Sequence, residues 1–141
     1  MFWDSSALVP LLVPEPQSSS LATLVADDRE ATIWWGTSLE CHSALHRRQR
    51  EQPLPAAVMT AAIERIRTVV EHADTVSPSD ELRRRAARLL AVHPLRAADA
   101  LQLAAALLWC EEQPHAEGFV SLDLRLREAA QKEGFSVLPT L

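Results

Sequence analysis

Short apolar runs alternate with longer amphipathic segments along the chain, a pattern typical of buried strands separated by helices. Residues 2–4 form the first apolar run, and an aspartate ends it. Glycine, proline or acidic residues bound most of the other runs, as is common at strand ends. The pattern predicts strands at residues 2–4, 31–35, 75–76, 119–122 and 135–138.

Helical patterns fill the intervals between these strands. Prolines, which end or begin helices, and glycine residues mark most of the boundaries. The predicted helices span residues 5–12, 16–26, 37–50, 80–91, 95–110 and 123–132, and one more, separated from the third by Pro53 and Pro55, runs to about residue 72. Because strands that alternate with helices form parallel sheets covered on both faces, we expect a three-layer α/β fold. Its central sheet would be mostly parallel and contain four to five strands.

Two of the predicted helices have distinctive faces. The segment at 95–110 is apolar on nearly every side, which predicts a helix buried in the centre of the domain. The segment at 80–91 is amphipathic, and its basic face indicates a solvated or partner-facing surface. The apolar face of that segment consists of Leu82, Ala86, Leu89 and Leu90, and the opposite face of Arg83, Arg84, Arg85 and Arg88.

Length and composition are those of one soluble domain. The 141 residues are 48% hydrophobic, enough for a single core, so we expect one domain over residues 1–141. No apolar stretch is long enough to span a membrane, and the N-terminus does not resemble a signal peptide. We therefore expect a cytoplasmic protein without a membrane partner. Cys41 and Cys110 form no CxxC pair and are expected to be free.

Charge and glycine usage narrow the function classes. The net charge of −5 argues against nonspecific wrapping of nucleic acid over the whole surface. Lys132 is the only lysine, so the remaining basic residues are arginines, which suit bidentate contacts to phosphates. The three glycines form no dinucleotide-binding fingerprint, no phosphate-binding P-loop and no serine-hydrolase elbow.

Four acids occupy one kind of position, at a strand end or in the first turn of the next helix. They are Asp4, Glu40, Asp99 and Asp123. Taken singly, each has a local explanation. Asp4 and Asp123 are plausible helix N-caps, residues 37–40 form a capping-box pattern, and Asp99 suits a helix N-terminus or an ion pair with Arg96.

Taken together, the four acids point to a site. In a doubly wound sheet, strand ends and helix N-termini lie along one edge, so all four side chains would meet in one crevice. Carboxylates placed close together repel one another unless a cation is present. A hard divalent ion such as Mg²⁺ or Mn²⁺ meets that need, and its bound water could attack a phosphodiester.

The segments around these acids resemble, in order and spacing, the motifs of PIN-domain ribonucleases, and most closely the toxin of a VapC-type toxin–antitoxin pair. The resemblance covers nearly the whole chain. Its motifs are Asp4-Ser5-Ser6-Ala7-Leu8-Val9, Thr37-Ser38-Leu39-Glu40 with Ala44-Leu45-His46-Arg47, Arg96-Ala97-Ala98-Asp99-Ala100-Leu101-Gln102-Leu103-Ala104, and Val120-Ser121-Leu122-Asp123-Leu124-Arg125-Leu126.

The resemblance implies a PIN-like fold and an Mg²⁺- or Mn²⁺-dependent endoribonuclease. It assigns Asp4, Glu40, Asp99 and Asp123 as catalytic and metal-binding carboxylates. It also implies that serine hydroxyls orient ligands, namely those of Ser5, Ser6 and Ser121. The expected partners are an RNA substrate, a small antitoxin and a second copy of the chain. Gln102 stands where many relatives have histidine, so the resemblance gives it no role.

Other residue groups have two readings each. Arg47, Arg48 and Arg50 follow Glu40 along one helix, so they either bind RNA phosphates or form an ordinary exposed face. His42 and His46 have a spacing that could share a zinc ion, but a solvated helix face is the better interpretation. Trp34 and Trp35 are predicted to be core residues, although a tryptophan at a strand end can also stack on a base.

Two alternatives to the ribonuclease hypothesis remain open at this stage. A phosphohydrolase would use Asp4 as its nucleophile. Position 6 is serine rather than a second aspartate, and one lysine is available for a phosphoryl group, which weakens this reading. A binding module that keeps the fold without catalysis is the other alternative.

Overall fold

A parallel five-stranded sheet forms the centre of the molecule. The computed structural model describes residues 1–141, and its sheet has the strand order β3-β2-β1-β4-β5 with every neighbouring pair parallel. The predicted strand number and direction are therefore confirmed. The strands are β1 (Phe2–Trp3), β2 (Thr32–Trp34), β3 (Asp74–Val76), β4 (Gly118–Val120) and β5 (Ser136–Leu138).

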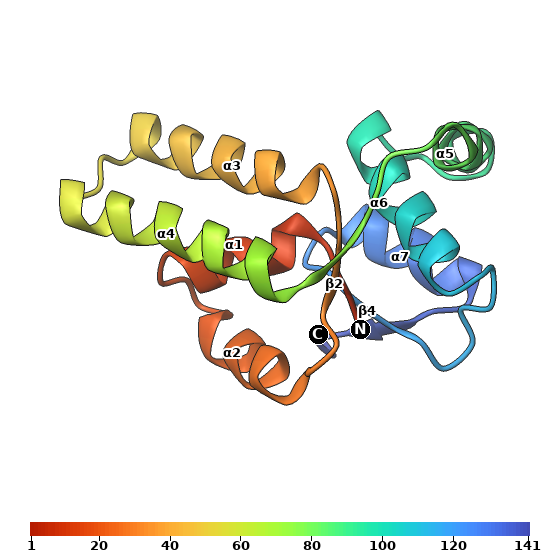
Figure 1. Cartoon of the computed structure of the whole chain (residues 1–141), viewed down its shortest axis with the longest axis horizontal. Coiled ribbons are helices and arrows are strands. Elements are labelled where there is room, and N and C mark those ends of the chain that lie inside the picture. The colour runs from red at the N-terminus through yellow and green to blue at the C-terminus, as the bar shows by residue number, and fades with distance from the viewer.

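Seven helices cover the two faces of this sheet (Figure 1). Four helices, with α3 and α4 side by side, lie to the left of the strands in Figure 1, and three lie to the right. The first group is α1 (Ser5–Leu12), α2 (Ser18–Asp27), α3 (Thr37–Glu51) and α4 (Ala56–His72). The second group is α5 (Asp80–Val92), α6 (Ala97–Trp109) and α7 (Leu124–Glu133).

The two faces of the sheet bury separate hydrophobic clusters. Because successive strand residues point to opposite faces, neighbours in β1 divide between them. Phe2 packs with α5, α6 and α7, whereas Trp3 packs with α1, α2, α3 and α4. Phe119 and Val120 of β4 divide in the same way. The sheet is thus buried on both sides, as expected for parallel strands.

The connection order places a crevice between β1 and β4. From β1 the chain proceeds outward through β2 to β3, then crosses back to β4 on the other side of β1. Neighbouring strands that lead away in opposite directions leave a gap at their carboxyl ends, where ligands bind in open α/β sheets. Residues that follow β1 and β4 therefore border the same crevice.

Most helix boundaries lie within one or two residues of the predicted ones. The helix predicted from residue 16 begins at Ser18, and residues 16–17 form a turn instead. As predicted, α6 is the central helix, with residues 102–107 all buried. No helix in the structure is both long and apolar enough to cross a membrane.

Trp35, predicted to be in the core, and Leu90, predicted on the apolar face of its helix, are exposed. Trp34 is buried, but Trp35 is 63% exposed, so its assignment to the core is wrong. The strand ends at Trp34, so Trp35 lies in the turn before α3, outside the buried part of the sheet, and its side chain points to solvent. Leu90 is 44% exposed, because the buried face of α5 is narrower than its apolar sequence pattern.

Gly36, between β2 and α3, is required by a close approach. A β-carbon at this position would lie 2.5 Å from Nε1 of Trp34, so any side chain would displace the indole ring. The glycine lets α3 begin directly above the buried tryptophan. This start places the first turn of α3, with Glu40, at the carboxyl edge of the sheet.

Candidate active site

A cleft of about 560 Å³ lies at the carboxyl edge of the sheet, where the crevice was predicted. One wall comes from α1 and α3, and the other from the N-terminal ends of α6 and α7. The cleft is lined by Ser5, Ser6, Val9, Glu15, Glu40, Ser43, Ala44, Arg47, Arg96, Ala98, Asp99, Asp123 and Arg125. Three of the four predicted carboxylates therefore line the cleft.

Asp4, the fourth carboxylate, lies directly beneath the cleft. It is the N-cap of α1 and accepts a hydrogen bond from the Ser6 backbone N–H (3.3 Å). Its Oδ2 atom also accepts hydrogen bonds from the hydroxyls of Ser6 and Ser121, the latter at 2.9 Å. The side chain is 3% exposed, and this burial raises the pKa of the carboxyl group despite the hydrogen bonds that favour its charged form.

The two hydroxyls that hold Asp4 also fix the loop after β4. Ser6 Oγ accepts hydrogen bonds from the backbone N–H groups of Leu122 (2.8 Å) and Asp123 (3.2 Å). Ser121 Oγ accepts a hydrogen bond from the same Asp123 N–H at 3.1 Å. The predicted serines thus lie at the site, and they join the end of β1 to the end of β4.

Glu40 reaches across the cleft from the first turn of α3. Ser5 Oγ donates to its Oε2 at 2.8 Å, and Gln102 Nε2 donates to its Oε1 at 3.3 Å. Burial raises the pKa of this carboxyl group, and the nearby charge of Asp4 raises it further. The predicted capping box at residues 37–40 is wrong, because the N-cap is Gly36 and the Thr37 hydroxyl accepts a hydrogen bond from Gln102 instead.

Asp99 and Asp123 face the cleft from the opposite wall. Asp99 lies in the first turn of α6 and accepts a hydrogen bond from the Arg96 backbone N–H (3.4 Å). Its carboxylate makes no ion pair with the Arg96 side chain, so that local explanation is wrong. Burial raises the pKa of Asp99, and the Asp123 charge contributes. Asp123 is the N-cap of α7, as predicted, and accepts from the Leu126 N–H at 2.9 Å.

Three arginines share the cleft with these acids. Arg47 lines it from α3, and Arg96 and Arg125 line it from the opposite wall. None of the three is in an ion pair with an acidic side chain. Arg48, which the sequence pattern groups with Arg47, does not line the cleft, and its Nε atom is buried without a hydrogen-bond partner. The reason is helical geometry, since consecutive residues point about 100° apart.

Among the charged cleft residues, Arg125 and Glu15 had no predicted role. Arg125 follows Asp123 by two positions, and a basic residue in the first turn after a predicted site acid is a signal that was available. Glu15 lies in the turn between α1 and α2, and nothing in the sequence pattern connects it to the other acids. Only the folding of α1 against α3 brings Glu15 to this wall.

The donor set fits a hard divalent cation in its chemistry. All four candidate ligands offer carboxylate oxygens, which Mg²⁺ and Mn²⁺ prefer. None of them is in an ion pair, and the pKa of three is raised by burial. As they stand, no three His, Cys, Asp or Glu side chains are close enough together to hold one ion. The carboxylates therefore surround the cleft without converging on a single point.

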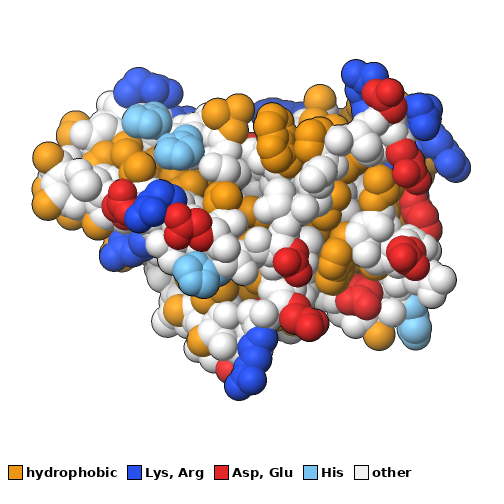
Figure 2. All heavy atoms as spheres, viewed as in Figure 1, with side chains coloured by type: hydrophobic (Ala, Val, Ile, Leu, Met, Phe, Trp, Pro, Cys, Tyr) orange, Lys and Arg blue, Asp and Glu red, His pale blue; other side chains and the backbone are white.

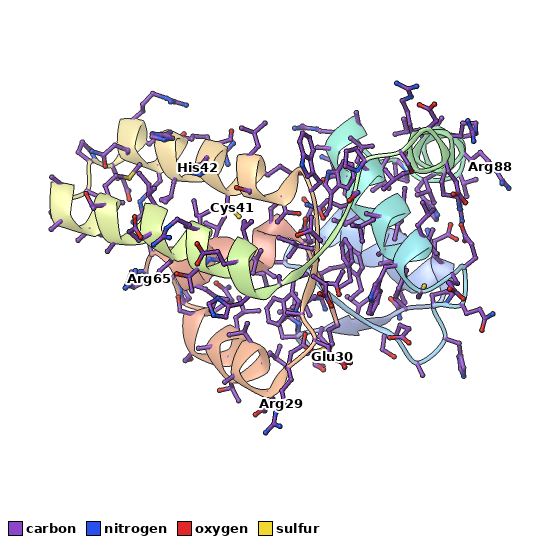
Figure 3. The ribbon with its side chains drawn as sticks, viewed as in Figure 1. Arg29, Glu30, Cys41, His42, Arg65 and Arg88 are labelled. Carbon is purple, nitrogen blue, oxygen red and sulfur yellow. The ribbon has the colours of Figure 1, made fainter.

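Residues away from the cleft have other roles. Burial raises the pKa of the Cys41 thiol to about 12, and Figure 3 shows this residue on the inner side of α3. Both cysteines are free. The rings of His42 and His46 stack with their centres 6.3 Å apart. In Figure 3, Arg88 lies on the outer side of α5, on the far side of the molecule from His42.

The arginine run of α5 is not uniformly solvated, which corrects the sequence-based expectation. Arg85 forms ion pairs with Glu112 (2.7 Å) and Glu133 (3.5 Å), and Glu133 also contacts the buried His93 at 2.6 Å. Figure 2 shows basic side chains along α5 and at the outer end of α3, with apolar side chains on the upper edge between them.

No protein-family model matches the chain, and neither does any curated protein sequence. Solved structures do share its fold. FitAcB from Neisseria gonorrhoeae superposes with a TM-score of 0.67 at 14% identity, over 98% of this chain and 96% of that chain. VapC20 from Mycobacterium tuberculosis, described as a sarcin-ricin loop cleaving toxin, has a TM-score of 0.64 at 14% identity, over 91% and 93%.

A toxin–antitoxin complex from Klebsiella pneumoniae gives a TM-score of 0.59 at 17% identity, over 86% of this chain and 85% of that chain. At identities this low, the similarity establishes the fold. The chain therefore has the α/β fold of VapC-type toxins, and the predicted PIN-like fold class is confirmed.

Proposed function

We propose that the protein is an Mg²⁺- or Mn²⁺-dependent endoribonuclease. The observation that carries this proposal is the set of four carboxylates, none of them in an ion pair, around one cleft at the crevice of the sheet. Such a set is costly for an empty protein, because full or partial burial disfavours the charged forms of Asp4, Glu40 and Asp99 and their charges repel one another. A bound cation removes that cost. The shared fold with VapC20, an RNA-cleaving toxin by description, supports the same substrate class.

Asp4, Glu40, Asp99 and Asp123 would hold the cation. When bound, a divalent ion supplies an activated water and neutralises charge on the phosphodiester. Two carboxylate oxygens, Oδ1 of Asp99 and Oδ2 of Asp123, accept no hydrogen bond from the protein. These two atoms are thus available as ligands or as acceptors for the proton of the attacking water. Asp4 suits a ligand better than a nucleophile, because its carboxylate is buried and already accepts hydrogen bonds from the hydroxyls of Ser5, Ser6 and Ser121.

The three arginines of the cleft would bind the phosphates on either side of the scissile bond. Arg47 approaches from one wall and Arg96 and Arg125 from the other. Guanidinium groups without an ion-pair partner can form bidentate hydrogen bonds to phosphate oxygens. Their placement on both walls would hold an RNA backbone across the carboxylates. Ser5, which donates to Glu40, keeps that carboxylate directed into the cleft.

We further propose that the protein acts as the toxin of a toxin–antitoxin pair, in the cytoplasm. One solved structure of the same fold is described as a toxin–antitoxin complex, which supports a small protein partner that inhibits the nuclease. A homodimer is part of the same proposal. Co-expression with the product of the neighbouring reading frame, followed by purification of the complex, tests the antitoxin. Sedimentation of the isolated chain tests the dimer.

The nuclease proposal is tested by one substitution and a matched control. Asp99→Asn removes a cleft carboxylate, whereas Asp27→Asn makes the same chemical change at an exposed position of α2. RNA cleavage in Mn²⁺ should fall by at least about 100-fold in the first variant, the effect typical of losing a catalytic acid or base. The control should cleave like the unmodified protein. Equal cleavage by both variants would show that this cleft is not the active site.

Two further measurements separate the alternatives. A phosphohydrolase that uses Asp4 would become covalently labelled at that residue by a phosphoryl analogue, and Asp4→Asn would prevent the labelling. A binding module without catalysis would show no RNA cleavage and no thermal stabilisation by Mn²⁺.

A further inference from the structure

Gln102 is a fully buried polar side chain in the central helix, one turn beyond Asp99. It is 0% exposed, and its Nε2 atom donates hydrogen bonds to Thr37 Oγ1 (3.0 Å) and to Glu40 Oε1 (3.3 Å). Both partners belong to α3, so the amide connects the two walls of the cleft. None of the neighbouring core positions in α6 carries a polar side chain.

The amide is poorly suited to a purely structural role. Its Oε1 atom is buried and accepts no hydrogen bond, and an unsatisfied buried carbonyl oxygen costs stability. An apolar side chain of the same length would avoid that cost. Buried polar groups that are incompletely satisfied occur at functional sites, where local rules of stability are broken for another purpose.

The Glu40 carboxylate depends on this amide for its direction. Ser5 of α1 donates to Oε2, Gln102 of α6 donates to Oε1, and no other protein group donates to either oxygen. Each oxygen is therefore held from a different wall of the cleft. Loss of one donor leaves the carboxylate free to rotate about its terminal bond, because the remaining contact constrains only one oxygen.

We propose that Gln102 is a positioning residue that holds the Glu40 carboxylate in the orientation required for a divalent cation. The inference rests on the proposed function, since it concerns the same cleft. Groups that orient metal ligands typically change metal affinity by about 10 to 100 times when removed. Gln102 acts through Glu40 and touches neither the substrate nor the cation.

The test uses a double variant that removes both partners of the Gln102–Thr37 hydrogen bond and, with them, the Gln102 donor to the part-buried Glu40 carboxylate. Gln102→Met keeps the side-chain length and Thr37→Val keeps the shape, so both changed positions stay filled and apolar. Replacing both partners of a buried hydrogen bond by apolar groups of similar shape is close to neutral for folding. We expect an unchanged or higher Tm without metal, and an Mn²⁺ dissociation constant about 10 to 100 times higher by calorimetry.

Thr37→Val alone is the matched control, because it leaves the hydrogen bond from Gln102 to Glu40 in place. Its Mn²⁺ affinity should equal that of the unmodified protein. A double variant with a lowered Tm and unchanged Mn²⁺ affinity would overturn the inference and make Gln102 a structural residue.

Crystal structures of both metal-free proteins separate this inference from the proposed function. The inference expects the Glu40 carboxylate in the double variant to rotate about its terminal bond, away from the orientation that it has in the unmodified protein. A carboxylate that stays in place would overturn it, whether or not the protein binds Mn²⁺. If the unmodified protein shows no heat of Mn²⁺ binding, the proposed metal-dependent function fails, and the crystal structures still decide whether Gln102 positions Glu40.

Discussion

The hydroxyl oxygens of Ser6 and Ser121 lie 3.2 Å apart, although the two residues are separated by 115 positions in the chain. Both donate to the same oxygen of Asp4, so they connect the ends of the two central strands through one buried carboxylate. The geometry of the candidate site is therefore coupled to the stability of the sheet edge.

Ser6→Ala should lower the free energy of unfolding by about 2 kcal/mol, because it leaves a backbone N–H group without its partner at a part-buried position. The hydroxyl of Ser6 is the only acceptor for the Leu122 N–H, whereas the Asp123 N–H keeps a second acceptor in Ser121. Ser121→Ala should therefore cost less. Urea denaturation measures both values, and Ser19→Ala in the exposed face of α2 is the control. Equal losses in all three variants would contradict this account.

The candidate carboxylates should destabilise the protein at neutral pH. Burial raises the pKa of Asp4, Glu40 and Asp99, so between their ordinary and raised values the folded state binds more protons than the unfolded state. Stability then increases as the pH falls through the raised values and is lowest above them. The double variant Glu40→Gln with Asp99→Asn should be more stable than the unmodified protein at pH 7.

That difference should disappear as the pH approaches the ordinary carboxyl values of 3.8 and 4.5. Urea midpoints measured at several pH values, without divalent ions, give the comparison. A double variant that is less stable than the unmodified protein at pH 7, and whose stability depends on pH in the same way, would show that these carboxylates stabilise the fold.

Mn²⁺ should stabilise the unmodified protein against unfolding. A ligand that binds only the folded state contributes about 2.7 kcal/mol when its concentration is 100 times its dissociation constant. The double variant Glu40→Gln with Asp99→Asn should lose this effect, because half of the proposed ligands are gone. Thermal unfolding with and without Mn²⁺ measures it, and Asp27→Asn should respond like the unmodified protein.

Arg47 and Arg48 are neighbours on α3 with different expected contributions to RNA binding. Arg47 lines the cleft and Arg48 does not. In an Asp99→Asn background that binds without cleaving, Arg47→Ala should weaken RNA affinity and reduce the salt dependence by about one phosphate contact. Arg48→Ala should change neither quantity. Fluorescence anisotropy at several salt concentrations measures the RNA affinity of both variants. Equal effects of the two substitutions would indicate that RNA binds to a diffuse basic surface.

Trp34 and Trp35 should differ strongly in their contribution to stability. Trp34 is 6% exposed and packs in the core against α5 and α6, so Trp34→Ala should cost about 3–5 kcal/mol. Trp35 is mostly exposed, and Trp35→Ala should cost less than about 1 kcal/mol. Chemical denaturation of the two variants, followed by circular dichroism, provides the measurement. A large loss in the Trp35 variant would mean that its exposed ring is covered by another molecule, such as a second copy.

The fold could be predicted from the sequence because the local signals agree. Helix ends that propensity alone would leave uncertain are marked by the prolines at 14, 53, 55 and 94 and by the glycine at 134. The sequence of α6 is apolar on nearly every side, which predicts its buried, central position. Alternation within β1 sends Phe2 and Trp3 to different layers. Each of these signals depends on only a few neighbouring residues, so it can be interpreted without knowledge of the tertiary structure.

The arrangement of the site was less predictable, since it depends on side-chain directions. Residues 37–40 match a capping box, yet Gln102, more than sixty positions away, provides a better partner for Thr37 and Glu40. Hydrogen bonds from a distant helix thus take the place of the local capping box expected at residues 37–40. The positions of Arg47 and Arg48 differ only by one step around a helix, which charge patterning does not resolve. Four acids at strand and helix ends were identifiable because their position follows from topology.

The cleft lies at the seam between two separately packed halves of the molecule. Its α1 and α3 wall belongs to one hydrophobic cluster and its α6 and α7 wall to the other, and the halves otherwise meet mainly through very short strands. An RNA or cation bound by both walls would restrict the motion of the two halves relative to each other. Amide protons in α3 and α6, far apart in the chain, would then exchange with solvent more slowly and in concert.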